Sequence, residues 1–154
     1  MKKIVIIKEL KQKKNQKKSI NKDQISMINQ YFTNSLDKLE TQSIEQELRK
    51  KLCGYKQQDK LKKKYDSETF LNLDELVDKM VASKLVCFYC KIRVNIFYNF
   101  ARDPQQWTLD RKDNSIGHSC ENTIICCLKC NLQRRTQNMD KFLFTKNLQI
   151  IKTG

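Results

Sequence analysis

The spacing of apolar residues predicts a helix near the start of the chain. From residue 23 to residue 41, apolar side chains recur at intervals of three and four, which lays one apolar stripe along a helix. Asp23 is placed to cap the N-terminus of this helix. The stripe consists of Ile28, Tyr31, Phe32, Leu36 and Leu39. Stripes of this kind are typical of ordinary core packing.

A second helix is expected to begin at Ser43. Ser43 and Gln46 form a capping-box pattern, in which each side chain satisfies a backbone N–H group at the start of a helix. The apolar stripe that follows consists of Ile44, Leu48 and Leu52. The helix either continues towards Gly54 or restarts at Tyr55.

A third helix is the clearest of the set. Asn72 is its expected cap, and Glu75 stands three residues later, as a capping box requires. The shared apolar face consists of Leu73, Leu76, Val77, Met80 and Val81. After Lys84 the helical period is lost. The expected elements are then strands at 85–90, 107–110 and 122–126, a strand or irregular segment at 94–100, and a helix from residue 131 onward.

The charge balance favours a polyanionic partner. Lys and Arg number 31 against 17 Asp and Glu, which gives a formal net charge of +14 over 154 residues. Nucleic acid is the favoured partner of such a chain, and an acidic membrane surface or an acidic protein is the competing interpretation. No apolar stretch approaches the roughly 18 residues that a membrane span needs. The apolar run of four at residues 4–7 is too short for a signal peptide, so we expect an intracellular protein without a membrane partner.

Two segments concentrate the positive charge. Residues 1–22 hold nine Lys and one acid, Glu9, which indicates a disordered tail, a phosphate-seeking arm, or both. Residues 49–64 hold eight basic residues and one acid, Asp59. The candidate DNA-binding residues are Lys60, Lys62, Lys63, Lys64, Arg134 and Arg135.

The cysteines favour a metal site over disulfides. There are seven, an odd number, and no secretion signal accompanies them. Four stand in two CxxC pairs with 36 residues between the pairs: Cys87, Cys90, Cys127 and Cys130. Two such turns can close a tetrahedral structural zinc site, with each sulfur ~2.3 Å from the ion. The alternative is that some of the four are ordinary buried thiols.

The other three cysteines are weaker candidates. Cys126 is a rival ligand, although pairing with Cys130 would need a three-residue gap. Cys120 and Cys53 have no CxxC partner and are interpreted as free thiols.

The stretch between and around the second CxxC pair resembles an HNH, or ββα-metal, nuclease. The residues that carry the resemblance are WTLDRKDNSIGH at 107–118, ENTIIC at 121–126 and CLKCN at 127–131. The similarity is to the zinc-knuckle, recombination endonuclease VII-like branch found in large DNA viruses and phages. It covers residues 87–135, roughly a third of the chain. It extends more weakly to residues 55–59.

The resemblance implies a catalytic role for several residues. Asp110 and Asn131 would bind the catalytic divalent cation, Mg²⁺ or Mn²⁺, and Asn122 would brace the hairpin loop through its amide. Phosphodiester hydrolysis needs such an ion on the scissile phosphate and an activated water as nucleophile.

One position departs from the family pattern. The family's general base is a His directly after the metal-binding acid, and here that position is Arg111, which stays protonated. His118, the single histidine, lies at the far side of the expected loop and could swing in as the base, or be structural. Asp113 is a weaker candidate base, and Arg111 would grip the phosphate.

The sequence therefore predicts an α+β fold: a helical region of two or three helices, then a small zinc-stapled ββα-metal (HNH) unit. The expected divisions are a tail at 1–22, the helical region at 23–84 and the HNH domain at 85–145.

The favoured function is a metal-dependent DNA endonuclease. The alternative is a catalytically inactive, zinc-stabilised DNA-binding or virion-structural protein, and a protein-interaction zinc module explains the charge least well. A homodimer is open, because the amphipathic helices could form an interface or pack on their own domain. If the protein is viral, the resemblance implies that it acts in the infected cell or the virion.

Overall fold

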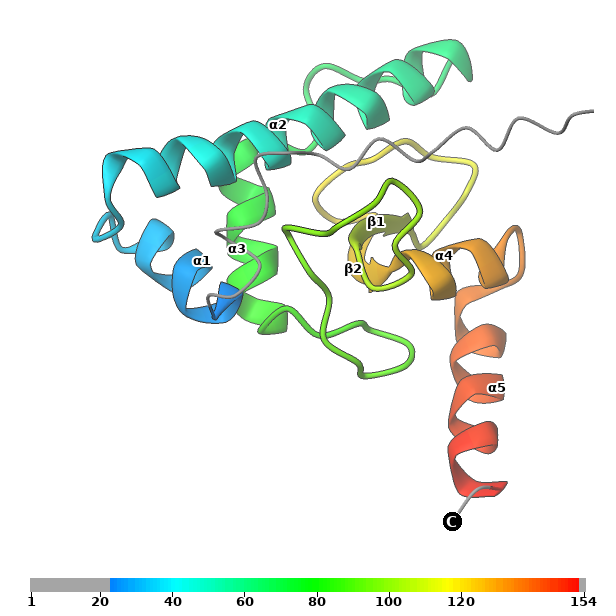
Figure 1. Ribbon diagram of the computed structural model, residues 1–154. Coiled ribbons are helices and arrows are strands. Elements are labelled where there is room, and N and C mark those ends of the chain that lie inside the picture. Colours follow the sequence, from blue (N-terminus) through cyan, green and yellow to red (C-terminus); the bar gives the residue numbers. More distant parts are fainter. Residues whose placement is uncertain (1–22, 153–154) are drawn as a thin grey trace, which may run out of the picture.

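The computed structural model describes residues 23–152, which form five helices and a two-stranded antiparallel sheet (Figure 1). The elements are α1 (Gln24–Phe32), α2 (Lys38–Leu61), α3 (Leu73–Ser83), β1 (Trp107–Arg111), β2 (Thr123–Cys127), α4 (Leu128–Arg134) and α5 (Met139–Lys152). The predicted α+β class is confirmed. The predicted tail at 1–22 lies outside the described residues.

The first helix is shorter than its apolar stripe suggested. The Asp23 carboxylate accepts from the Ile25 N–H at 3.1 Å, so the predicted cap is confirmed. The helix nevertheless ends at Phe32, and the predicted continuation to residue 41 is wrong. The Thr33 hydroxyl donates to the Asn29 carbonyl, and Asn34 takes a φ of 56°, which is left-handed and cannot continue a right-handed helix.

The second helix begins earlier than predicted. Asp37 is its cap, because the Asp37 carboxylate accepts from the Glu40 N–H at 2.8 Å. Ser43 therefore lies inside the helix, where its hydroxyl donates to the Leu39 carbonyl, and the predicted start at Ser43 is wrong. Gly54 does not end α2, which runs on to Leu61.

The third helix follows its prediction. Asn72 Oδ1 accepts from the Glu75 N–H at 2.9 Å, and a Glu75 carboxylate oxygen accepts from the Asn72 N–H at 3.0 Å. The capping box is therefore complete. Leu76, Val77 and Met80 are buried, as the shared apolar face predicted.

The two short strands pair as an antiparallel hairpin, with Leu109 opposite Ile125. The predicted strands at 107–110 and 122–126 are confirmed to within one residue at each end. Alternate residues of a strand point to opposite faces. Trp107 and Leu109 face the core with the helices, whereas Thr108 and Asp110 are bonded to side chains of α4 on the other face.

The segment before the hairpin is irregular. The predicted strand at 85–90 is wrong, since Val86 forms a single isolated bridge with Arg93 and the chain turns at once. The segment meets β2 through one main-chain bond, from the Phe88 N–H to the Ile125 carbonyl at 3.1 Å, which does not make a strand ladder. Farther on, the Gln24 side chain of α1 satisfies backbone N–H groups that a neighbouring strand would otherwise bond. Its Oε1 accepts from the N–H groups of Ile96 at 2.7 Å and Phe97 at 3.1 Å.

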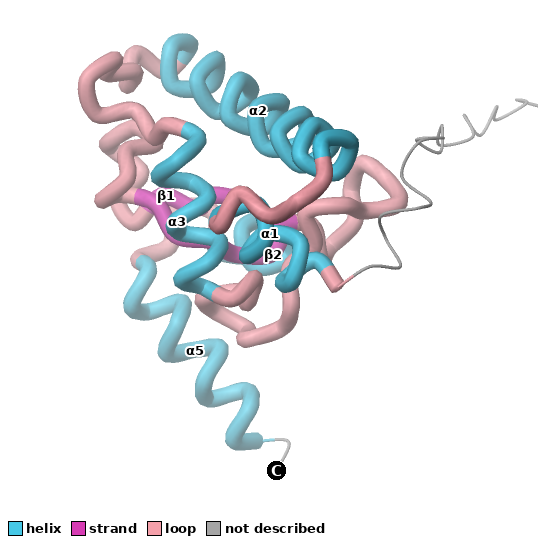
Figure 2. Tube along the Cα trace, turned by 90° about the vertical axis from the view of Figure 1, so that its left-hand side faces the viewer, coloured by secondary structure: helices cyan, strands magenta, loops and turns pink. Residues whose placement is uncertain are grey.

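Two helices follow the hairpin, not one. The helix predicted from residue 131 begins three residues earlier at Leu128 and ends at Arg134, after which Arg135 has a φ of 53°. The separate helix α5 was not predicted. It extends away from the body of the molecule in both views (Figures 1 and 2), and Phe142 anchors it edge-on against Tyr89, with ring centroids 4.9 Å apart.

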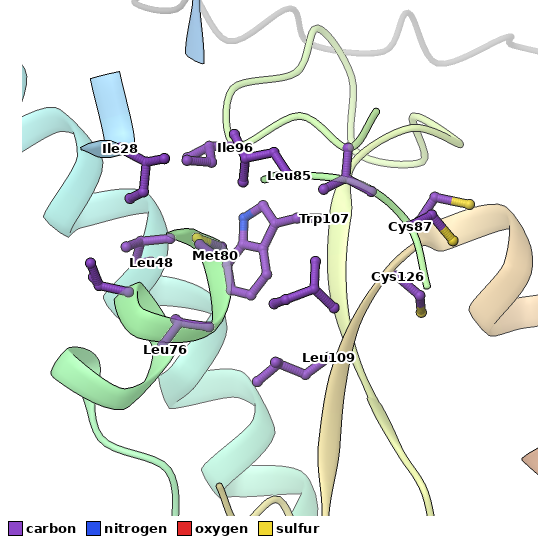
Figure 3. Packing of buried hydrophobic residues seen from close by; sticks show 14 of the residues in the cluster. Ile28, Leu48, Leu76, Met80, Leu85, Cys87, Ile96, Trp107, Leu109 and Cys126 are labelled. Atoms are coloured by element: carbon purple, nitrogen blue, oxygen red, sulfur yellow. The ribbon is translucent and has the colours of Figure 1, made fainter. Parts of the chain in front are cut away.

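A single hydrophobic cluster joins the helices to the hairpin. Trp107 lies at its centre, between the residues of α1, α2 and α3 on one side and those of the hairpin on the other (Figure 3). Lys51 of α2 strengthens this join, because its ammonium group lies 4.6 Å from the centre of the Trp107 ring and donates to the Trp107 carbonyl. Helix α2 therefore fixes the position of β1.

Two glycines offer a matched test of this packing. A Cβ at position 117 would lie 2.7 Å from Asp59 Oδ2 and would also collide with the Lys64 carbonyl, whereas a Cβ at position 54 meets nothing within 4 Å. We predict that Gly117→Ala lowers the free energy of unfolding by about 1–3 kcal/mol. Gly54→Ala should raise it by about 0.5–1 kcal/mol, because alanine is the better helix residue. Urea unfolding measures both, and a stability change of the same sign in the two variants would contradict the packing described.

Candidate metal centre and basic hairpin

Four cysteine sulfurs converge between the 87–90 turn and the start of α4. The Sγ atoms of Cys87, Cys90, Cys127 and Cys130 all lie within 4.8 Å of one another, so the group could hold a metal ion. The sulfurs of Cys90 and Cys127 are 3.8 Å apart. Tetrahedral zinc with bonds of ~2.3 Å places its sulfurs ~3.8 Å apart. The donor set and its spacing fit zinc.

The turns that carry these cysteines are built to aim them inward. In the first, the Lys91 N–H donates to the Cys87 carbonyl at 3.1 Å. In the second, Cys127 is the cap of α4, and its sulfur accepts from the Cys130 N–H at 3.4 Å. The second pair thus sits at a helix N-terminus, where the helix dipole stabilises thiolates.

One thiol of the cluster is already acidic. A hydrogen bond from the Cys127 thiol lowers the pKa of Cys87 to about 4. The same contact raises the pKa of Cys127, which keeps the shared proton. This hydrogen bond favours the thiolate at Cys87, and the thiolate is the form of cysteine that binds a metal.

The remaining cysteines stay outside the cluster. Cys126 is buried on the strand beside Thr108, whose hydroxyl lies 3.3 Å from its sulfur. Burial raises the pKa of the Cys126 thiol well above its ordinary value, so it stays a neutral core residue. Of the described cysteines, Cys53 and Cys120 also lie outside the group.

Asp110 is buried and already has a cation beside it. Its Oδ2 lies 2.8 Å from the Arg134 guanidinium and accepts from the Tyr89 hydroxyl at 2.5 Å. Burial, followed by the bond to Asp110, raises the pKa of Tyr89, so its proton stays available. Burial is the largest single influence on Arg134 and lowers its pKa, but the hydrogen bond and charge of Asp110, together with Tyr89, raise the pKa above its ordinary value, so the guanidinium stays charged.

These residues do not fit a divalent cation. A guanidinium already neutralises Asp110, the one acid expected to bind the ion. The Asn131 side chain bonds the strand through its Nδ2, which donates to Thr108 Oγ1 at 3.1 Å and to the Leu109 carbonyl at 3.3 Å. In the described part of the chain, the four cysteines are the one group of three or more metal-ligating His, Cys, Asp or Glu side chains.

His118 is clamped by Asp59. The two Asp59 carboxylate oxygens bond the His118 N–H and its Nδ1, each at 2.7 Å, and the ring lies against Tyr55 with centroids 4.6 Å apart. Both partners are buried. Among the described residues, no hydrogen bond joins His118 to Asp110. This geometry favours a structural role, which ties the hairpin loop to α2.

Asn122 makes the bonds that a brace requires. Its Nδ2 donates to the Asp113 and Gly117 carbonyls, each at 3.0 Å, and its Oδ1 accepts from the Asp113 N–H at 3.0 Å. The amide therefore closes both ends of the loop between the strands. Arg111 helps from the other side, where its guanidinium donates to the Asn114 and Ile116 carbonyls at 3.2 Å.

The basic residues at the end of α2 lie beside this loop. Lys64 Nζ donates to the Asn114 carbonyl at 2.5 Å, which joins the two segments. Lys60 Nζ lies 5.1 Å from the centre of the Tyr65 ring. Lys62, Lys63 and Arg135 are exposed. We call this surface the basic edge; it consists of Lys60, Lys62, Lys63, Lys64, Arg111 and Arg135.

Arg134 does not belong to the basic edge. The sequence placed Arg134 among the DNA-binding residues. Its side chain is only 2% exposed and forms an ion pair with Asp110, so that prediction is wrong. The sequence did not predict two partners of the candidate site residues: Tyr89, which bonds Asp110, and Asp59, which bonds His118. Asp59 had a signal, because it is the single acid in a segment of eight basic residues. Tyr89 had none, because a tyrosine inside a CxxC pair suggests only turn packing.

No protein-family model matches the chain, and neither a curated protein nor a solved structure matches it. None of the helices within residues 23–152 is long and apolar enough to cross a membrane.

The metal centre has a matched test. We predict that the protein carries one Zn²⁺ per chain by elemental analysis. Cys87→Ser should lose the metal and the cooperative unfolding transition, because a small core next to a closed site depends on its metal. Cys126→Ala, one residue from a ligand, should keep a full equivalent of zinc. Wild-type protein that keeps its unfolding transition after complete removal of metal would contradict the assignment.

The histidine clamp gives a pH test. Burial is the first cause that lowers the pKa of His118, with the positive charges of Arg111 and Lys62 adding to it, and the bond to Asp59 opposes it. Neutral His118 therefore favours the fold. The stability that neutral His118 contributes is fully present above the unfolded-state pKa of about 6.5. It is lost as the pH falls from that value towards the lower pKa of His118 in the folded protein.

We accordingly expect wild-type protein to lose more stability than His118→Gln between about pH 7.5 and about pH 5.5. Denaturant unfolding at each pH measures the difference, and metal release at low pH affects both proteins alike. Parallel stability curves would show that His118 does not titrate in this range.

Proposed function

We propose that this protein is a zinc-stabilised DNA-binding protein on an HNH-type ββα scaffold, and that it binds DNA without hydrolysing it. One observation carries the proposal: the carboxylate in the place of the catalytic metal ligand is buried and paired with the protein's own Arg134. This is the inactive alternative to an endonuclease, and the geometry supports it better.

The arrangement of elements supports the HNH-type scaffold. The hairpin β1–β2 is followed directly by α4, and the two cysteine pairs lie before β1 and at the start of α4. Asn122 closes the loop, as the middle residue of the motif is expected to do. Each of these features fits the resemblance that residues 107–131 carry, and the scaffold is proposed on these features alone.

Two further features argue against hydrolysis. A divalent cation at Asp110 would lie beside a guanidinium 2.8 Å from the same carboxylate, and like charges in a buried site repel strongly. A general base is also missing from the position after Asp110, because Arg111 cannot accept a proton. His118 does not replace it, because Asp59 and Tyr55 hold its ring.

The basic edge supports DNA as the partner. Its cations come from the end of α2 and the residues after it, from the end of β1 and from the turn after α4. Lys64 and Arg135 both bond Asn114 of the hairpin loop, which brings these segments together. Lysine contacts to phosphates give affinity without sequence readout, so we expect non-specific backbone binding. Two acids directly precede members of the basic edge, and both are directed inward: Asp59 bonds His118, and Asp110 bonds Arg134.

A DNA endonuclease remains the second candidate, and one observation favours it. In the described part of the chain, both hydrogen bonds to the Asp110 carboxylate fall on Oδ2, which leaves Oδ1 for another ligand. Hydrolysis would then require Arg134 to leave Asp110 when DNA and Mg²⁺ or Mn²⁺ bind. Nicking of supercoiled DNA, abolished in Asp110→Ala, would establish this candidate in place of the first.

The DNA-binding proposal is tested by matched charge reversals. Lys62→Glu/Lys63→Glu changes two exposed lysines of the basic edge, and Lys38→Glu/Lys141→Glu changes two exposed lysines elsewhere. Each phosphate neutralised on a duplex contributes about −0.9 to the slope of log K against log salt. We expect the first variant to flatten this slope by about 2 and the control to leave it nearly unchanged.

Fluorescence anisotropy with a short DNA duplex at several salt concentrations measures the slopes. Equal slopes in the two variants would remove the basic edge as the DNA-binding surface. Absence of binding by the wild type at low salt would overturn the proposed function as a whole.

A further inference from the structure

The Arg134 side chain is surrounded by oxygen atoms. Besides Asp110 Oδ2 at 2.8 Å, its guanidinium donates to three main-chain carbonyls: Gln137 at 2.9 Å, Lys112 at 3.0 Å and Arg111. All three guanidinium nitrogens take part. The four acceptors come from the end of β1, the start of the loop and the turn after α4.

This set of acceptors has the character of a cation site. It is made of oxygen atoms alone, one from a carboxylate and three from carbonyls, which are the ligands that hard cations take in proteins. Its formal charge is −1, which one guanidinium balances. Tyr89 completes the shell with a hydroxyl on the same carboxylate oxygen. The site is dry, because Arg134 is 2% exposed.

The same contacts hold the unit together. Main-chain contacts between β1 and β2 form the hairpin, but Arg134 is the side chain that bonds α4 both to β1 and to the turn before α5. Without its cation, the buried Asp110 carboxylate would face carbonyl dipoles of its own sign. Such a site is unstable until a positive charge fills it.

We propose that Arg134 is the resident cation of an oxygen cage, in the place where the HNH resemblance expects a divalent ion. The binding site is the set of oxygen atoms around Arg134, which we call the cage. When the arginine side chain is removed, the cage binds a small cation, either a free guanidinium ion or a hard divalent ion. The proposal rests on the contacts of Arg134 and not on DNA binding.

Cation rescue of Arg134→Ala tests this proposal on the full, zinc-loaded chain. We expect its melting temperature to fall on the order of 10 °C, since a buried charge is left alone. Millimolar methylguanidinium or Ca²⁺ should then recover several degrees. Arg135→Ala changes an exposed neighbour, so its melting temperature should stay at the wild-type value with or without the added ion. Tetramethylammonium has no N–H donor and should not raise the melting temperature of Arg134→Ala.

Recovery by methylguanidinium, by Ca²⁺ or by both supports the cage. Recovery by neither ion, or an Arg134→Ala protein as stable as the wild type, overturns it. DNA plays no part in the measurement, so a failure of the DNA-binding proposal leaves this result unaffected.

A second pair of variants decides the question if the alanine variant does not fold. Arg134→Lys keeps a positive charge in the cage, and Arg134→Met fills similar volume without one. We expect the lysine variant to melt at a clearly higher temperature than the methionine variant. Equal melting temperatures, or equal failure to fold, would show that volume and not charge is needed, and would overturn the proposal.

Discussion

A carboxylate buried in a protein keeps its charge only if a cation lies beside it, and this requirement shapes the hairpin–α4 unit. Asp110 is placed inside by β1, whose other face supplies Trp107 and Leu109 to the core. Arg134 of α4 meets it at 2.8 Å, so the position of the helix on the strand is fixed by charge as well as by packing. Removing either partner would cost about 3–5 kcal/mol.

Two other joins surround this pair, and each relies on a different interaction. The four-cysteine cluster ties the 87–90 turn to the first turn of α4 through a metal that its sulfurs could hold. The bond of His118 to Asp59 ties the loop to α2. The hairpin is therefore held at three points, and its small two-stranded sheet does not depend on its own hydrogen bonds alone.

Much of this architecture follows from local sequence. The Asn72 capping box and the two strands follow from short-range patterns. The two CxxC pairs are 36 residues apart, and their convergence could be predicted because four cysteines in this spacing are the ligands of one tetrahedral metal site. The early end of α1 depended on Asn34, a residue that favours turns and the left-handed region, but the apolar stripe that continues past it pointed to a longer helix. The partner of Asp110 could not be foreseen, because Arg134 lies 24 residues away and arginines on a basic chain are expected at the surface.

The central claim is that Asp110 is neutralised by Arg134 and has no need of a divalent ion. Isothermal titration of the zinc-loaded wild-type protein with Mn²⁺ tests it most directly, with Asp110→Asn as the comparison. The account predicts that the two proteins give the same featureless titration at millimolar Mn²⁺. A one-to-one binding step in the wild type that disappears in Asp110→Asn would contradict it.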